Sequence, residues 1–203
     1  MKKYAVLHEP GDIVTLAGTR FVVLDVERRG SLPDSLFLLA LESVGASEFG
    51  SSNNYAESDL KKAVDKWLED MGKRGLDNAK LIPREIDLTT LDGSGCYGKL
   101  SVKAAPLTLD EAREYADIIP NAERWCWLAT GWSGPSKSDG DLALCVGSNG
   151  DWGSYGCSVS YGIRPALKIP SDLLLDSADK PDLSEVPTDT LLEEIRRRVV
   201  DKA

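Results

Sequence analysis

The residues whose types and spacing best suit binding chemistry lie between Trp132 and Tyr161. Glycine recurs at every third position from 147 to 156, and serine, asparagine, aspartate, tryptophan and tyrosine stand between the glycines. Tyrosine and tryptophan give a large contact area at low entropic cost, while serine, glycine and asparagine supply adaptable hydrogen bonds. This mixture predicts a ligand-binding surface. Its candidate residues are Trp132, Ser148, Asn149, Asp151, Trp152, Ser154, Tyr155, Ser158 and Tyr161.

The same stretch also fits a set of hairpin turns around a packed core. Trp125-Cys126-Trp127-Leu128 alternates between two faces, so we expect at least one of the two tryptophans to be buried. Trp132, Trp152 and Tyr155 have polar and glycine neighbours and are expected at the surface. The glycines do not lie between a strand and a helix, and the chain contains no phosphate-loop motif, so a nucleotide cradle is not predicted.

Few residues offer catalytic chemistry. His8 is the only histidine of the chain, and we expect it at the surface. Asp139, Asp141 and Asp151 stand among glycine, serine and asparagine, where aspartate commonly forms turns. The segment 138–141 lacks the later bidentate glutamate of a calcium-binding loop. We therefore expect no catalytic residue, no bound metal and no cofactor.

The four cysteines are Cys96, Cys126, Cys145 and Cys157. None forms a C-x-x-C pair, which makes a zinc site a weak interpretation. In a reducing compartment they are expected as free thiols that pack like small apolar groups. A Cys126–Cys145 disulfide is the alternative if the protein leaves the cell.

Length and charge limit the classes of partner. The chain has 203 residues, which suits one domain with an additional segment, and its net charge of −9 repels nucleic-acid phosphates. Its one basic cluster, residues 196–198, follows two glutamates. The chain has neither the roughly 20-residue apolar run of a membrane span nor a signal-peptide core. We expect no membrane insertion, and a cytoplasmic or virion-associated protein.

Periodicity predicts an α+β fold. Three apolar runs, at 13–16, 20–26 and 36–41, are typical of strands, and turn residues at 17–19 join the first two. A helix is expected after Asn54, with Glu57 completing a capping box. Its apolar face comprises Leu60, Val64, Trp67 and Leu68. Thr108 and Glu111 form a second capping box before a short helix, and from residue 125 onward strands return.

The tail differs in composition from the rest of the chain. Residues 171–189 are acidic and contain prolines, which is typical of a linker. Residues 190–203 begin with a capping box and place Leu191, Leu192, Ile195 and Val199 on one helical stripe. The predicted organisation is therefore a domain at 1–170, an acidic linker at 171–189 and a C-terminal helix at 190–203. That helix packs on its own domain, on a partner or on a second copy.

Several segments resemble a family of bacterial and phage domains of unknown function. The runs at 11–14, 21–24 and 36–39 resemble its opening strands. Residues 53–62 resemble its first helix, written N-x-W-x-x-S-x-L-R-x-W-L. Trp125-Cys126-Trp127-Leu128-Ala129 resembles its W-W-L-R-S segment, and Gly162-Ile163-Arg164-Pro165-Ala166-Leu167 resembles its closing G-V-R-P-A-L. The likeness covers about residues 11–169, with the motifs in order.

The resemblance implies a C-type-lectin-like fold, with two main helices, antiparallel sheets and a loop-rich face. Formylglycine-generating enzymes and the variable proteins of diversity-generating retroelements share that fold. Leu128-Ala129-Thr130 replaces the family's L-R-S-P stretch, so the role of that arginine does not transfer. The chain has no Glu-Pro-Asn or Trp-Asn-Asp motif, so a calcium-dependent sugar site is not implied.

These observations favour a non-enzymatic protein that binds a protein or cell-surface ligand, in a phage, prophage or bacterial setting. One alternative is a virion-type structural or assembly protein, a homo-oligomer for example, that docks through its C-terminal helix. Another is a formylglycine-generating type of enzyme, for which Cys126, Cys145 and Cys157 are the candidate cysteines. Arg164, between apolar neighbours, is expected either to be paired with a charged group or to donate hydrogen bonds to loop carbonyls, and so to fix the preceding loop.

Overall fold

The computed structural model describes residues 2–4, 8–29, 32–171 and 173–177. Its helical elements are the 3-10 turn η2 (Tyr55–Glu57), α1 (Asp59–Lys73) and α2 (Leu109–Glu114). Its strands are β1 (Lys2–Tyr4), β2 (Ile13–Leu16), β3 (Thr19–Arg29), β4 (Leu32–Ala40), β5 (Ala46–Glu48), β6 (Arg84–Asp87), β7 (Lys99–Val102), β8 (Ala104–Ala105), β9 (Cys126–Gly131), β10 (Leu142–Val146), β11 (Trp152–Gly156), β12 (Ser160–Gly162), β13 (Ala166–Pro170) and β14 (Leu174–Ser177). The predicted α+β class is confirmed.

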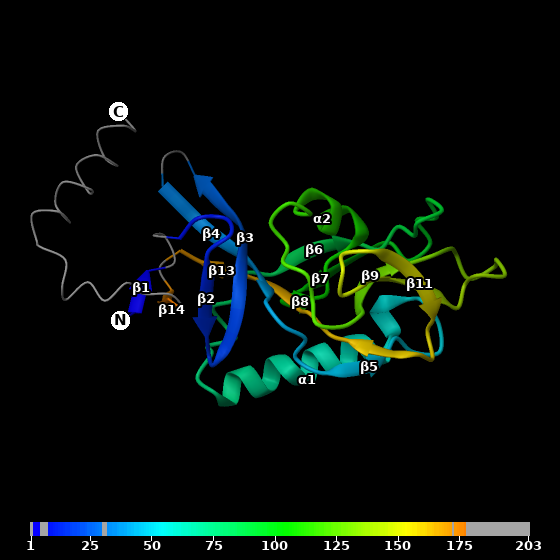
Figure 1. Cartoon of the computed structure of the whole chain (residues 1–203), viewed down its shortest axis with the longest axis horizontal. Coiled ribbons are helices and arrows are strands. Elements are labelled where there is room, and N and C mark those ends of the chain that lie inside the picture. The colour runs from blue at the N-terminus through cyan, green and yellow to red at the C-terminus, as the bar shows by residue number, and fades with distance from the viewer. Residues whose placement is uncertain (1, 5–7, 30–31, 172, 178–203) are drawn as a thin grey trace, which may run out of the picture.

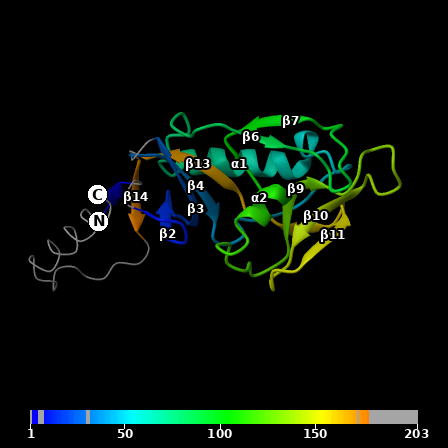
Figure 2. The same cartoon turned by 90° about the horizontal axis from the view of Figure 1, so that it is seen from above.

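The described strands form two main sheets and a small hairpin. The first sheet has the order β1-β14-β2-β3-β4-β13-β8, the second has the order β11-β10-β9-β12-β5, and β6 pairs with β7. Strand pairing in the described residues is antiparallel, except where β12 runs parallel to β9. The helices α1 and α2 lie on opposite sides of the strands (Figure 1). The view from above places β9, β10 and β11 side by side (Figure 2).

The N-terminal hairpin follows from its sequence. Ala17 and Gly18 both have positive φ angles, 47° and 77°, which suit the two-residue turn that matches strand twist. On β3, Phe21 and Val23 pack toward the α1 side, whereas Val22 and Leu24 pack toward the α2 side. Both faces of β3 are thus buried along residues 21–24, which explains why this part of the strand is continuously apolar.

The first helix begins later than predicted. Asn54 does act as a cap, but of the preceding turn η2, where its side chain accepts a hydrogen bond from the Ala56 N–H. The N-cap of α1 is Ser58, which accepts from the Lys61 N–H at 2.9 Å. Ser58 is the N-cap of α1 because residues 55–57 form a separate 3-10 turn before the α-helix starts. The predicted apolar face is otherwise confirmed, with Trp67 half-buried.

The second helix has the predicted capping box. The Thr108 side chain accepts from the Glu111 N–H, and the Glu111 carboxylate accepts from the Thr108 N–H at 2.8 Å. The same carboxylate forms a salt bridge with the buried Arg84. One glutamate therefore starts α2 and fastens it to β6.

One prediction about strands needs correction. The stretch 147–156, expected to consist of turns, contains β11, which pairs with β10 from Leu142↔Gly156 to Val146↔Trp152. Residues 159–169, within the region where strands were expected, contain two strands that belong to different sheets, β12 and β13. The change of direction lies at residues 163–165, where Pro165 has no N–H to continue the ladder.

The expected linker begins with structure. Residues 174–177 form β14, which pairs with β1 and β2 and extends the first sheet. The rest of the predicted linker, and the predicted C-terminal helix at 190–203, lie outside the described residues. Within the described ranges, no helix has the length and apolar character needed to span a membrane.

Asn53 joins four parts of the fold. Its buried side-chain nitrogen donates to the carbonyls of Ser133 and Leu142 at 2.9 and 3.0 Å, and its side-chain oxygen accepts from the Tyr97 hydroxyl at 2.6 Å. Each of these groups lies on a different segment. Gly131 leaves the space for this amide, since a Cβ there would lie 2.8 Å from the Asn53 side chain.

We predict that Asn53→Ala lowers the free energy of unfolding by about 2–4 kcal/mol, because three buried hydrogen bonds lose their partner. Asn54→Ala is the matched control, since it removes one cap bond and costs about 1 kcal/mol. Urea denaturation followed by circular dichroism measures both. Equal losses in the two variants would contradict the assigned importance of Asn53.

Candidate functional site

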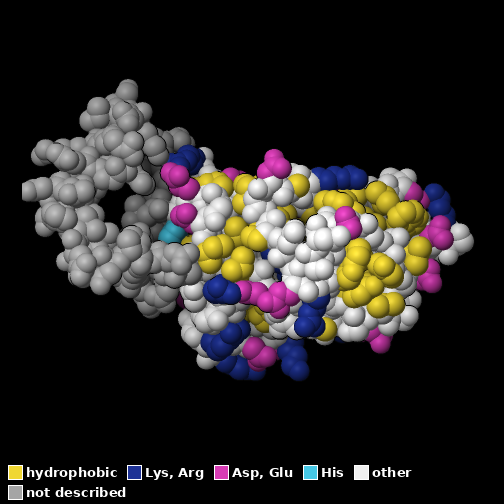
Figure 3. All heavy atoms as spheres, in the orientation of Figure 1, with side chains coloured by type: hydrophobic (Ala, Val, Ile, Leu, Met, Phe, Trp, Pro, Cys, Tyr) yellow, Lys and Arg dark blue, Asp and Glu magenta, His cyan; other side chains and the backbone are white. Residues whose placement is uncertain are grey.

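A cleft lies between α2, with the segment that follows it, and one face of the second sheet. It consists of two adjoining cavities of about 120 and 570 Å³, and both are lined by Ala116 and Trp152. We call this the α2 cleft. Trp152 is 47% exposed, whereas Trp132 is half-buried. Apolar side chains also gather on the end of the molecule that carries the second sheet (Figure 3).

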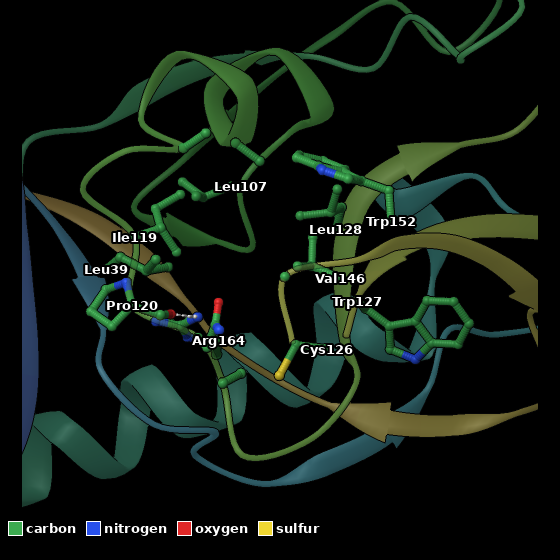
Figure 4. A pocket seen from close by; sticks show the side chains of 15 residues that line it. Leu39, Leu107, Ile119, Pro120, Cys126, Trp127, Leu128, Val146, Trp152 and Arg164 are labelled. Atoms are coloured by element: carbon green, nitrogen blue, oxygen red, sulfur yellow. Dashed lines mark hydrogen bonds between the residues drawn. The ribbon is translucent and has the colours of Figure 1, made fainter. Parts of the chain in front are cut away.

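The walls of the α2 cleft come from several elements. The strands contribute Leu128, Leu144 and Val146, whose side chains belong to the α2 side of the second sheet. The opposite wall includes Ala112, Ala116, Ile119, Pro120 and Ala122. The alanine side chains on this wall are small, so they leave the space between the wall and the sheet unfilled. Figure 4 shows Trp152 at one end of the first cavity, near Leu128, and Arg164 at the other end, beside Pro120.

The predicted site residues do not share one face. Strand alternation puts Trp152 and Ser154 on the cleft side of β11, opposite Val146 and Leu144 of β10. Tyr155 points to the other side of the sheet, opposite Ala143. Of the nine predicted residues, the cleft thus includes Trp132, Trp152 and Ser154. The nine residues do not form a single surface, because Tyr155 and Tyr161 lie on the far face of the sheet and Ser148, Asn149, Asp151 and Ser158 lie in turns.

Tyr155 and Tyr161 belong to an aromatic cluster on that far face. Their ring centroids lie 5.2 Å apart, and Trp125 lies 5.6 Å from Tyr155. Trp127 lies 4.9 Å from Tyr161 and is 1% exposed, which confirms the expectation that one of the two tryptophans is in the core. Tyr161 is half-buried, and Tyr155 remains 40% exposed. These rings mainly support the sheet.

The other predicted residues form turns. Ser148, Asn149 and Asp151 are exposed between β10 and β11, where the Asn149 side-chain oxygen accepts from the Asp151 N–H at 3.3 Å. The Gly147 N–H donates to the Asp151 carbonyl at 2.7 Å and closes the turn. Ser158 is exposed between β11 and β12. Their contacts within the chain are those of hairpin formation.

The glycine spacing has a packing explanation. A Cβ added at Gly147 would lie 3.0 Å from the Trp125 ring, and one at Gly153 would lie 2.9 Å from it. Gly150 has a φ of 85°, which side chains rarely adopt. These glycines make room for one indole and for one turn, which sequence spacing alone did not reveal.

Arg164 is buried at the closed end of the cleft, with 7% of its surface exposed. As expected, its guanidinium donates to backbone carbonyls: Nε to Ala40 at 3.0 Å and Nη1 to Pro120 at 3.1 Å. Its Nη2 has no hydrogen-bond partner. The sequence predicted the carbonyl bonds but not the position of Arg164 in a cavity, which depends on the path of residues 116–122.

His8 is buried rather than at the surface, with 5% of its area exposed. Its Nδ1 lies 3.3 Å from an Asp12 carboxylate oxygen. His8 is covered because the chain turns back at Gly11, whose N–H donates to the Val23 carbonyl. In the ranges that the structure describes, no three His, Cys, Asp or Glu side chains cluster as metal ligands do.

All four cysteines are free thiols, so the alternative Cys126–Cys145 disulfide is not formed. Burial raises the pKa of Cys126 to about 11, although nearby Arg164 opposes that rise. Burial likewise raises the pKa of Cys145 and of Cys157 to about 12. Because the thiolate is the nucleophile, these groups are poor nucleophiles at neutral pH. Cys96 is exposed.

We predict that iodoacetamide at pH 8 labels Cys96 and spares the other three cysteines in the folded chain. A pH of 8 lies below the raised pKa values of the three buried thiols, so these thiols stay protonated. Peptide mass spectrometry identifies the labelled positions, and the same reaction in urea should label all four. Labelling of Cys126, Cys145 or Cys157 at the rate of Cys96 would favour the cysteine-dependent enzyme instead.

Comparisons with family models, with curated proteins and with solved structures found no match to this chain. The site is therefore defined by its geometry: a cleft with apolar walls, an exposed indole at one end and a buried guanidinium at the other. Such a concave surface, with a few polar groups in apolar walls, is the usual form of a ligand site.

Proposed function

We propose that this chain is a non-enzymatic binding protein with a C-type-lectin-like fold, and that the α2 cleft takes an apolar group of its ligand. The observation that carries the proposal is Trp152. This indole is 47% exposed and lines both cavities of the cleft. An exposed tryptophan beside an apolar cavity costs hydration free energy that a bound apolar group recovers.

The arrangement of the strands supports binding by a preformed site. Leu128, Leu144 and Val146 are fixed on paired central strands of the second sheet. The facing wall is held by the capping box of α2 and by the Arg84–Glu111 salt bridge. A ligand that enters the cleft therefore orders few side chains, which reduces the entropic cost of association.

The shape and apolar walls of the α2 cleft restrict which kind of ligand fits. The chain's protein or cell-surface ligand is one that presents an apolar group small enough for the cleft. Tyr155, Tyr161 and the exposed turn residues are not required for that contact, because they lie on the far face or at the hairpin tip. The C-type-lectin-like fold is supported by the order of the motifs and by two helices on opposite sides of the strands.

We predict that octan-1-ol, a neutral apolar probe, binds saturably to the full chain and that Trp152→Ala weakens this binding about tenfold. The magnitude corresponds to losing roughly 50–60 Å² of apolar contact. Isothermal titration calorimetry measures the affinity, and circular dichroism checks the fold of each variant.

Tyr155→Ala is the matched control, since it removes an equally exposed aromatic residue from the same strand but from the other face. Its affinity for octan-1-ol should equal that of the unmodified chain. No saturable binding by the unmodified chain, or an equal loss in both variants, would overturn the assignment of the ligand site to the α2 cleft.

A further inference from the structure

Among the described residues two arginines are buried, and their charges are satisfied in different ways. Arg84 forms a salt bridge with Glu111, donates to the carbonyls of Ala105 and Pro106, and lies 5.1 Å from the centre of the Phe37 ring. Its charge is thus neutralised within the fold. This is the usual arrangement, because a buried cation without a counter-ion is costly.

Arg164 has no such counter-ion. Among the described residues it forms no salt bridge, and its two hydrogen bonds are to neutral carbonyls. Its Nη2 is buried without a hydrogen-bond partner, as is the Nε of Arg84, so the absence of a salt bridge is what distinguishes Arg164. Burial also lowers the pKa of Arg164, in accord with the unfavourable surroundings of the charge. The guanidinium therefore has an unused donor and, among the described residues, no carboxylate within salt-bridge distance, since Glu42 acts on its charge only from farther away. A bound anion would use the donor and add a close counter-charge.

The cleft around Arg164 has a charge opposite to that of the whole protein. The residues that line its two cavities include Arg164 and Arg113 but no aspartate or glutamate in the described part of the chain. The chain as a whole carries a net charge of −9. The net negative charge of the chain attracts cations in general. Binding of an anion in the cleft must therefore come from the local placement of its arginines.

We propose that the α2 cleft binds an apolar carboxylate, whose carboxylate accepts a hydrogen bond from Arg164 Nη2 while its apolar chain extends along Leu128 and Val146 to Trp152. This inference rests on the proposed function, since it names the ligand class of the same cleft. Arg164 and Trp152 lie at opposite ends of the cavity (Figure 4). That separation suits an elongated ligand with one charged end.

Three probes of equal chain length test the proposal on the full chain: octanoate, octan-1-ol and octylammonium. Calorimetry at pH 7.5 and low salt should show octanoate binding about tenfold more tightly than octan-1-ol, because a charge-assisted hydrogen bond is gained. Octylammonium should bind most weakly, although the net charge of the chain attracts it.

Two variants separate the two arginines. Arg164→Gln should abolish the preference for octanoate over octan-1-ol, whereas Arg113→Gln, at the exposed rim, should keep most of it. Equal affinities for octanoate and octan-1-ol would overturn the carboxylate inference and leave the proposed function standing. No binding of any probe would overturn both. Loss of the preference in Arg113→Gln alone would also overturn the role of Arg164.

Thermal unfolding of the unmodified chain gives the same answer if Arg164→Gln does not fold. Octanoate should raise Tm more than octan-1-ol at equal concentration, because a ligand that binds only the folded state stabilises it by an amount that increases with affinity. An equal rise with both probes would contradict the inference.

Discussion

A buried guanidinium lies at the junction between the two sheets and connects three segments of the chain. The chain leaves the second sheet after β12 and enters the first sheet at β13, and Arg164 lies between them. Its Nε holds the carbonyl of Ala40 at the end of β4, and its Nη1 holds Pro120 in the segment after α2. The same side chain thus sets the end of the first sheet and the position of the cleft wall. Its third nitrogen, Nη2, is buried and has no hydrogen-bond partner.

Strand alternation gives the two faces of the second sheet different surroundings. On β11, Trp152 faces α2 and Tyr155 faces the aromatic cluster around Trp125 and Tyr161. The far face is closed by ring packing and by glycines that admit the Trp125 indole. The near face is only partly covered because α2 is six residues long. An apolar cleft remains where a longer helix would have completed the core.

Local patterns predicted much of the fold, and long-range packing decided the rest. The β2–β3 hairpin, the apolar face of α1 and the capping box of α2 are local and were predicted. The strand β11 was taken for turns because Gly153 and Gly156 hide the alternation, and Gly153 makes room for Trp125, which lies 28 residues earlier in the sequence. In the candidate site, Trp132, Trp152 and Ser154 were predicted. The position of Arg164 in the cavity was missed, because no local pattern brings residues 116–122 beside it.

The most direct test of the account is a crystal structure of the full chain grown with 8-bromooctanoate. If the α2 cleft is the carboxylate site, we expect anomalous bromine density between α2 and Trp152, with the carboxylate within hydrogen-bond distance of Arg164 Nη2. Bromine density on the far face beside Tyr155, or a carboxylate at Arg113 with Arg164 Nη2 still unpartnered, would contradict it.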